Sequence, residues 1–296
     1  MKRQTSKFAI LAIIAISTVI PSFASAQSTG VKKAMESAKE TIDSLVSSKD
    51  GKKSDELSLR IQTLKQAISL SIAEAKDSSA KLSAIKNLAG DELSWQTSKL
   101  NEFVSVISYF EAQNKNIDNN VSDLTAIEVK NIAENFKAWR EENYLPTLNE
   151  VRDYLLIDQQ EKTVDMAKSR YQKIDEDIKK LEKVKVKNID SARKMLQNAN
   201  TLVSAGDVII KEAHTSFFDT FITVSTSTAT SSEITDINKE AIISNNLTGD
   251  NATSTLSGDL PQPKSIRDIV KDSSLKIRDA YKIFIDMSSL VRRLLK

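Results

Sequence analysis

The sequence predicts an all-α protein: an elongated antiparallel, coiled-coil-like helical bundle, then a flexible Ser/Thr-rich linker and a C-terminal amphipathic helix. Only six Gly and four Pro occur in 296 residues, and they lie mostly between apolar runs. Within those runs apolar residues recur at steps of three and four, which is the period of a helix that packs one face on partners. Aromatic residues form 5% of the chain, so mainly aliphatic side chains have to fill the core.

Residues 1–26 have the pattern of a cleaved secretory signal peptide. Three basic residues precede an uncharged apolar run of thirteen residues at 8–20. Such a run spans about 20 Å as a helix, whereas a bilayer core is about 30 Å thick, which disfavours the alternative of a retained anchor. Ala24 and Ala26 form an A-x-A cleavage pattern. We therefore expect a mature chain that begins at Gln27 and lies outside the cytoplasm, in the periplasm, on the cell surface or secreted.

Composition excludes several kinds of protein. No cysteine occurs, so disulfides and a lipid-modified cysteine are absent. Removing the three basic residues of the signal segment from 42 leaves 39 basic against 40 acidic side chains, a formal charge of −1. Nucleic-acid-binding proteins usually carry a strong basic excess. We therefore expect no nucleic-acid partner.

Residues 27–224 are predicted to form the bundle domain, and its first two helices meet at the turn 48–54. Ser28 or Thr29 can cap the first helix, which is expected to run to about Ser48, and Ser54 can cap the second. The apolar seam of the second helix contains Leu57, Ile61, Leu64, Ile68, Ala75, Leu82 and Ile85. The next joint is at 89–91, where Gly90 suits a helix C-terminus and Asp91 an N-cap.

Two further helices are expected between this joint and Pro146. The seam of the first contains Leu93, Leu100, Phe103, Ile107, Phe110, Ile117 and Val121. Thr125 and Glu128 then have the spacing of a capping box, which predicts a new helix start. Pro146 is expected to stop or kink that helix and to lie in the first turn of the next.

The rest of the domain is predicted to form two long helices. The segment from Leu148 to about Val184 changes phase near Asp158 and Glu161, where a kink or a second cap is expected. The next seam is the most regular: Ile189, Ala192, Leu196, Ala199, Val203, Gly206, Ile210, Ala213, Phe217, Phe221 and Val224. We interpret Gly206 as part of a continuous helix that lets a neighbour approach closely. The alternative is a break there, with Asp207 as the cap of a new helix.

After residue 224 the composition changes. Residues 225–263 are rich in Ser and Thr and poor in apolar side chains, which predicts a disordered linker, with a short helix near Ile234 to Ile243 as an alternative for that part of it. Residues 264–296 again have helical periodicity. Their seam contains Ile266, Val270, Ser273, Ile277, Ala280, Phe284, Met287, Val291 and Leu294. Charges interrupt this helix throughout, so it is not expected to cross a membrane.

Groups that could support catalysis are scarce. His214 is the one histidine, and as a general base it would need a positioned partner such as Asp207. We interpret it as a histidine on a helix face beside Phe217 and Phe218. Zinc-site and nucleophile motifs are absent from the sequence, as are phosphate-binding loops. We therefore expect no enzymatic activity, metal or cofactor.

Two groups of residues are candidates for surface contacts. A basic run contains Lys179, Lys180, Lys183, Lys185 and Lys187. It either complements a helix dipole or forms a patch for anionic envelope polymers or lipid headgroups. Trp139 and Tyr144 lie near another helix end. They either pack in the core or anchor a protein partner.

These observations favour a non-enzymatic extracytoplasmic protein with a structural or protein-interaction role, such as a helical spacer or scaffold. Its partners would be another protein or a second copy of itself, bound through helical seams. The alternative is weak association with the envelope or a membrane through the C-terminal amphipathic helix and the Lys179–Lys187 run.

Overall fold

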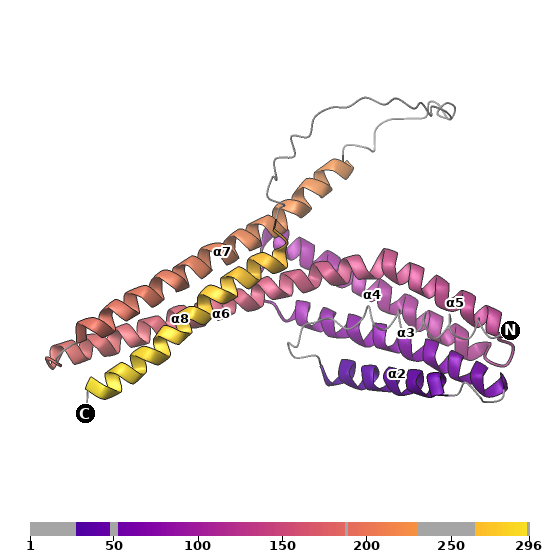
Figure 1. Cartoon of the computed structure of the whole chain (residues 1–296). Helices are drawn as coiled ribbons and strands as arrows, with labels where there is room; N and C mark the ends of the chain where they lie inside the picture. Colours follow the sequence, from indigo (N-terminus) through magenta and orange to yellow (C-terminus); the bar gives the residue numbers. More distant parts are fainter. Residues whose placement is uncertain (1–27, 48–52, 187–188, 230–263, 295–296) are drawn as a thin grey trace, which may run out of the picture. The chain divides into compact units, whose positions relative to one another are not determined.

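The computed structural model describes residues 28–47, 53–186, 189–229 and 264–294, and in these residues every regular element is helical (Figure 1). This confirms the predicted all-α class. The elements are α2 (Thr29–Ser47), α3 (Lys53–Ser83), α4 (Gly90–Asn119), α5 (Ala126–Trp139), the π-helical segment η1 (Arg140–Tyr144), α6 (Leu145–Lys183), α7 (Ile189–Ala229) and α8 (Ile266–Leu294). No described helix has an apolar stretch long enough to cross a bilayer.

The chain divides into two compact units, residues 1–155 and 156–296. This division differs from the sequence-based grouping, which placed 27–224 in one domain and 264–296 in a separate helix. The boundary falls within α6, which contributes its first residues to the first unit and the remainder to the second. Because α8 packs against α7, the C-terminal helix is an integral part of the second unit.

In the first unit, α3 packs against both α2 and α4. Lys65 of α3 pairs with Asp118, and Lys76 pairs with Glu111. From Lys65 to Lys76 the residue number rises along α3 while that of the partner on α4 falls, so the two helices are antiparallel. Most of the seam predicted for α3 is buried: Ile61, Leu64, Ile68, Ala75, Leu82 and Ile85.

Some predicted details of this unit differ from the structure. Leu93 and Val121 were placed on the α4 seam, but they are 48% and 51% exposed. Leu93 lies in the first turn of α4, and Val121 lies after its last residue, Asn119. Asp91 was expected to cap α4. The N-cap is Ala89, and Asp91 lies in the first helical turn, after Gly90 with its φ of +56°. The Thr125–Glu128 capping box of α5 is confirmed.

The helical path does not end at Pro146. It passes from α5 through η1 into α6, and Pro146 lies in the first turn of α6. The π-helical segment closes with a bond from the Leu145 N–H to the Arg140 carbonyl. Proline lacks an N–H donor, so a locally widened turn just before it keeps the helical path continuous. The second cap considered near Asp158 and Glu161 is absent, since α6 is a single helix.

The second unit consists of α7, α8 and most of α6. Arg193 near the start of α7 bonds Glu182 near the end of α6, and Asp207 further along α7 bonds Lys168. These pairs make α6 and α7 antiparallel. Ser273 of α8 hydrogen-bonds with Gln160 of α6, and Tyr281, further along α8, contacts Arg170, further along α6. The two helices are therefore parallel. The predicted seam of α8 is buried at Val270, Ser273, Ile277, Ala280, Phe284 and Met287.

Helix α7 runs through Gly206 without a break, as predicted, and continues to Ala229, beyond the expected end at 224. Several sequence-based predictions lie outside the described residues. These are the signal segment 1–26 with Ala24, Ala26 and the mature terminus Gln27, residues 230–263 of the linker, and Lys187.

Candidate functional site

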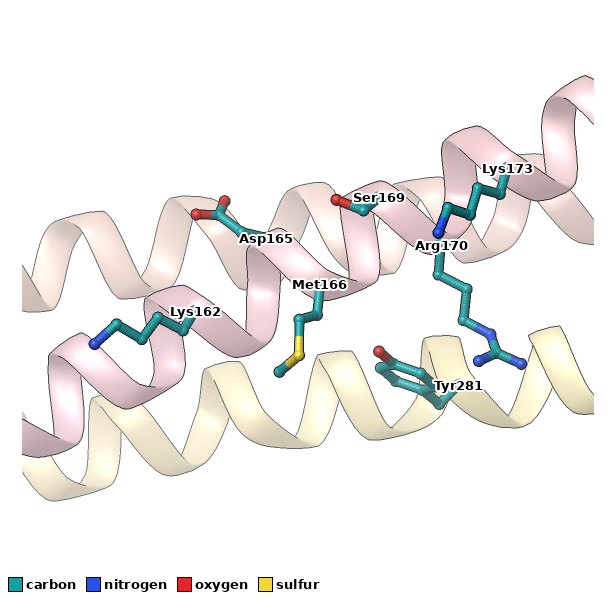
Figure 2. Close-up of a pocket in the computed structure, with 7 residues that line it drawn as sticks. All are labelled: Lys162, Asp165, Met166, Ser169, Arg170, Lys173 and Tyr281. Carbon is teal, nitrogen blue, oxygen red and sulfur yellow. The ribbon is translucent and has the colours of Figure 1, made fainter.

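An open groove of about 600 Å³ runs between α6 and α8 in the second unit (Figure 2). Its lining consists of Lys162, Asp165, Met166, Ser169, Arg170 and Lys173 from α6 and Tyr281 from α8. In Figure 2 the side chains of Met166 and Arg170 extend toward α8, whereas Asp165 points away from it. The groove therefore combines cationic side chains with an apolar surface.

The charge of the groove is unbalanced. Its lining has three basic side chains and one carboxylate. Asp165 pairs with Lys168 at 3.4 Å, and Lys162 pairs with Asp158 at 2.7 Å. The guanidinium of Arg170 lies 5.8 Å from the centre of the Tyr281 ring. Among the described residues, neither Arg170 nor Lys173 has a carboxylate partner, so two cations one helical turn apart face solvent.

A buried polar cluster fixes α8 against α6 and α7 near one end of this groove. The Ser273 hydroxyl donates to the Gly206 carbonyl at 2.8 Å and accepts from the Gln160 amide at 3.1 Å. Ser274 donates to the Gln160 side-chain oxygen at 2.9 Å. Ser273 is completely buried. Every member is bonded to another, so the cluster links three helices at one level without leaving a buried group unsatisfied.

Gly206 allows the backbones to approach at this level. A Cβ atom at this position would lie 2.9 Å from Cδ1 and 3.2 Å from Cγ1 of Ile277. No side chain could occupy that space without displacing Ile277. The predicted close approach of a neighbour at Gly206 is thereby confirmed, and the neighbour is α8.

Asp207, the next residue, connects α7 to the α6 side of the groove. Its carboxylate accepts from Lys168 at 2.8 Å and from Lys211 at 2.9 Å. Partial burial opposes ionisation, but these two ammonium groups outweigh it and lower the pKa of Asp207. Asp207 therefore serves as an ion-pair partner and not as a positioning group for His214. The His214 ring lies 5.2 Å from that of Phe218, on the helix face that the sequence predicted.

The two aromatic candidates have different environments. Tyr144 is completely buried and its hydroxyl donates to Glu74 at 3.1 Å, so the partner-anchor interpretation does not hold for this residue. Burial, with the nearby Glu74 carboxylate, raises its pKa well above the ordinary value. Trp139 is half-buried and stacks on Tyr109 with 3.8 Å between ring centres. Trp139 thus packs largely within the first unit.

A buried ion-pair cluster around Glu74 was not predicted from the sequence. Glu74 of α3 bonds Arg140 in η1 at 3.4 Å, and it also bonds Arg152 of α6. Glu74 and Arg140 are each 4% exposed. Arg140 also donates to the Ser71 hydroxyl at 3.2 Å. The sequence signal for this cluster is Glu74 next to the seam residue Ala75. The arginine partners of Glu74 are too distant in sequence to be identified by spacing.

A second polar cluster joins α4 to α6 in the first unit. The Trp95 indole and the Lys99 ammonium both donate to Glu150, and the Thr147 hydroxyl donates to Glu102 at 2.6 Å. Burial raises the pKa of Glu150 although Trp95 and Lys99 oppose that shift. Both the buried Glu74 cluster and this partly buried cluster have their partners within the protein, and their arrangement is that of helix-packing contacts.

The basic run at the end of α6 is interleaved with carboxylates. Lys179 pairs with Asp175 at 2.6 Å and Lys180 with Asp177 at 2.9 Å. Lys183 and Lys185 are exposed, and Lys185 has a φ of +56° in the turn that ends the helix. The ion pairs compensate half of the four described lysines, so the run is a weaker cationic patch than its sequence indicates.

No group of three or more metal-ligating side chains occurs in the part of the chain that the structure describes. The chain matches no protein-family model, and neither a curated protein nor a solved structure shows significant similarity to it. The local geometry of the α6–α8 groove therefore carries the functional argument.

Proposed function

We propose that this protein is a non-enzymatic, extracytoplasmic interaction protein whose α6–α8 groove binds another polypeptide. The observation that supports this function is the pair of uncompensated cations, Arg170 and Lys173, beside an apolar surface. Met166 in that surface is 58% exposed. Arginine, methionine and tyrosine are enriched at protein interfaces, where apolar contact and charge pairing combine.

Several features favour binding over catalysis. The groove is open to solvent and its lining has no histidine. General acid–base and nucleophilic catalysis need a reactive group held by a partner and protected from water. Arg170 and Lys173 instead offer positive charge on a helix surface, which suits recognition of carboxylates.

The alternative, membrane or envelope association through the C-terminal helix, is less well supported. The apolar face of α8 that contains Ile277, Phe284 and Met287 is already buried in the second unit, whereas Leu275 and Ile285 are exposed. An amphipathic helix binds a bilayer through its apolar face. Binding through α8 would therefore first require its release from α6 and α7, which would disrupt the Ser273 cluster.

In-cell photo-crosslinking tests the proposed function. A photoreactive phenylalanine analogue at Met166 is expected to give discrete cross-linked species. The same analogue at Val104, a 63% exposed residue of α4, serves as the matched control and is expected to give none. Equal patterns at both positions, or no product at Met166, would contradict an interaction role for the groove. N-terminal sequencing of the cell-fractionated protein tests the location, and we expect Gln27 in an extracytoplasmic fraction.

A further inference from the structure

We propose that the groove binds the acidic segment Glu233–Glu240 of a second copy of this chain, so that two copies exchange these segments. This inference rests on the proposed interaction role of the groove but not on the proposed location. Its three supporting arguments are charge complementarity, the apolar residues on both surfaces, and the length of α7.

The acidic segment carries negative charge, whereas the lining of the groove has an excess of positive charge. Residues 230–263 contain five acidic side chains and one basic side chain. Three of the acidic residues, Glu233, Asp236 and Glu240, fall within eight positions. Carboxylates at this density suit a surface on which Arg170 and Lys173 lie one helical turn apart without carboxylate partners.

Apolar residues accompany the charges on both surfaces. Ile234 and Ile237 alternate with the acidic residues of the segment. The groove offers the exposed Met166 side chain and the half-buried ring of Tyr281. An anionic polysaccharide or a lipid phosphate would satisfy the cations but would leave this apolar surface uncovered. A polypeptide that alternates carboxylates with isoleucines satisfies both.

The length of α7 opposes binding of the segment to the groove of its own chain. Asp207 bonds Lys168 and so lies at the level of the groove, and α7 continues for 22 residues to Ala229. At 1.5 Å per residue, Ala229 is about 33 Å beyond that level. A fully extended chain advances at most about 3.6 Å per residue, so Glu233 reaches back about 14 Å and Asp236 about 25 Å.

Glu240 reaches the level of Lys168 only if the chain after Ala229 advances about 3.0 Å per residue, which is close to full extension. The first two acidic residues cannot reach Arg170 or Lys173 within one chain. A second copy has no such constraint. Exchange in both directions forms a closed dimer in which each copy contributes one groove and one segment. Two linked contacts then strengthen each other through effective concentration.

Sedimentation of the purified full chain, with charge-reversed variants, tests the exchange. We expect a monomer–dimer equilibrium that weakens as salt increases. The groove variant Arg170→Glu/Lys173→Glu is expected to raise the dimer Kd by at least about tenfold, since attraction becomes repulsion in both grooves. The control Lys32→Glu/Lys39→Glu changes two exposed lysines of α2 by the same net charge and is expected to leave the dimer Kd unchanged.

A mixing experiment identifies the segment as the occupant. The segment variant Glu233→Lys/Asp236→Lys/Glu240→Lys is expected to lose dimerisation on its own, as is the groove variant. Mixed in equal amounts, the two variants are expected to form a heterodimer, because each groove then meets a segment of opposite charge.

Three results would overturn the exchange: a monomeric wild-type chain at every concentration, a dimer that withstands charge reversal, or two variants that fail to associate when mixed. A monomeric chain whose Met166 cross-links to a different protein would overturn the second copy as occupant while supporting the proposed interaction function. Absence of cross-links at Met166 would contradict both proposals.

Discussion

Replacing Gly206 with alanine tests the packing of α7 against α8. In an exposed helix interior this change is favourable by about 1 kcal/mol, because glycine has low helix propensity. Here the added methyl group would lie 2.9 Å from Cδ1 of Ile277, a side chain that is only 2% exposed. Overpacking of a buried site costs about 1–3 kcal/mol. We therefore expect Gly206→Ala to destabilise the second unit by about 1 kcal/mol.

A second substitution isolates the contact. Ile277→Val removes the Cδ1 atom that lies closest to the added methyl group. On its own it should cost about 0.5–1.5 kcal/mol. In the valine background, Gly206→Ala is expected to lose its penalty and to become stabilising through helix propensity. The two substitutions are then non-additive by about 1–2 kcal/mol, as expected for residues in direct contact.

Hydrogen exchange is the appropriate assay because both tryptophans, Trp95 and Trp139, belong to the first unit and do not report on the second. A loss of 1 kcal/mol corresponds to about fivefold faster exchange in α7 and α8. Gly30→Ala is the control, since a Cβ at Gly30 meets only the Ser28 hydroxyl at 3.8 Å. If Gly206→Ala slowed hydrogen exchange in α7 and α8, and did so equally in the wild-type and Ile277→Val backgrounds, the packing argument would be refuted.

Three further substitutions test other contacts. Glu74→Gln leaves the buried Arg140 guanidinium without its carboxylate and should cost about 3–5 kcal/mol in urea unfolding followed by tryptophan fluorescence; an unchanged midpoint would contradict a structural role for that ion pair. Thr125→Ala removes the capping box of α5 and should cost about 1 kcal/mol by the same assay, whereas no loss would show that the cap is dispensable. Arg193→Gln should raise the pKa of Glu182 toward its ordinary value, since the Arg193 hydrogen bond lowers it. A carboxylate whose pKa is lowered in the folded state adds stability above its ordinary pKa, and this contribution is lost as the pH falls. The stability of the second unit should therefore depend less on pH in this variant, as measured by hydrogen exchange from neutral pH to about pH 3.

The helices could be predicted from the sequence because their signals are local. The three-and-four spacing along α7 identified Leu196, Val203 and Ile210 as buried residues, and all three are buried. The capping box at Thr125 was predicted for the same reason, since both partners lie within four residues. By contrast, Leu93 and Val121 continue the α4 periodicity beyond its packed part, which periodicity alone does not reveal.

The groove could not be predicted because it depends on contacts between distant residues. Tyr281 and Arg170 are far apart in the sequence, and they meet only because α8 returns to pack beside α6. The Glu74–Arg140 pair is similarly distant. The basic run was overestimated for a related reason. Its lysines were counted without the neighbouring carboxylates, such as Asp175, that the helix places one turn away.

Both proposals depend on the docking of α8 at Gly206, because that contact positions Tyr281 beside Arg170. The most direct measurement is a nuclear Overhauser effect between the Ile277 δ1 methyl group and the Gly206 α protons in a methyl-labelled sample. The space of a Cβ at Gly206 lies 2.9 Å from that methyl carbon, so we predict a strong cross-peak. With both resonances assigned, its absence would contradict the docking of α8 and the groove that this docking forms.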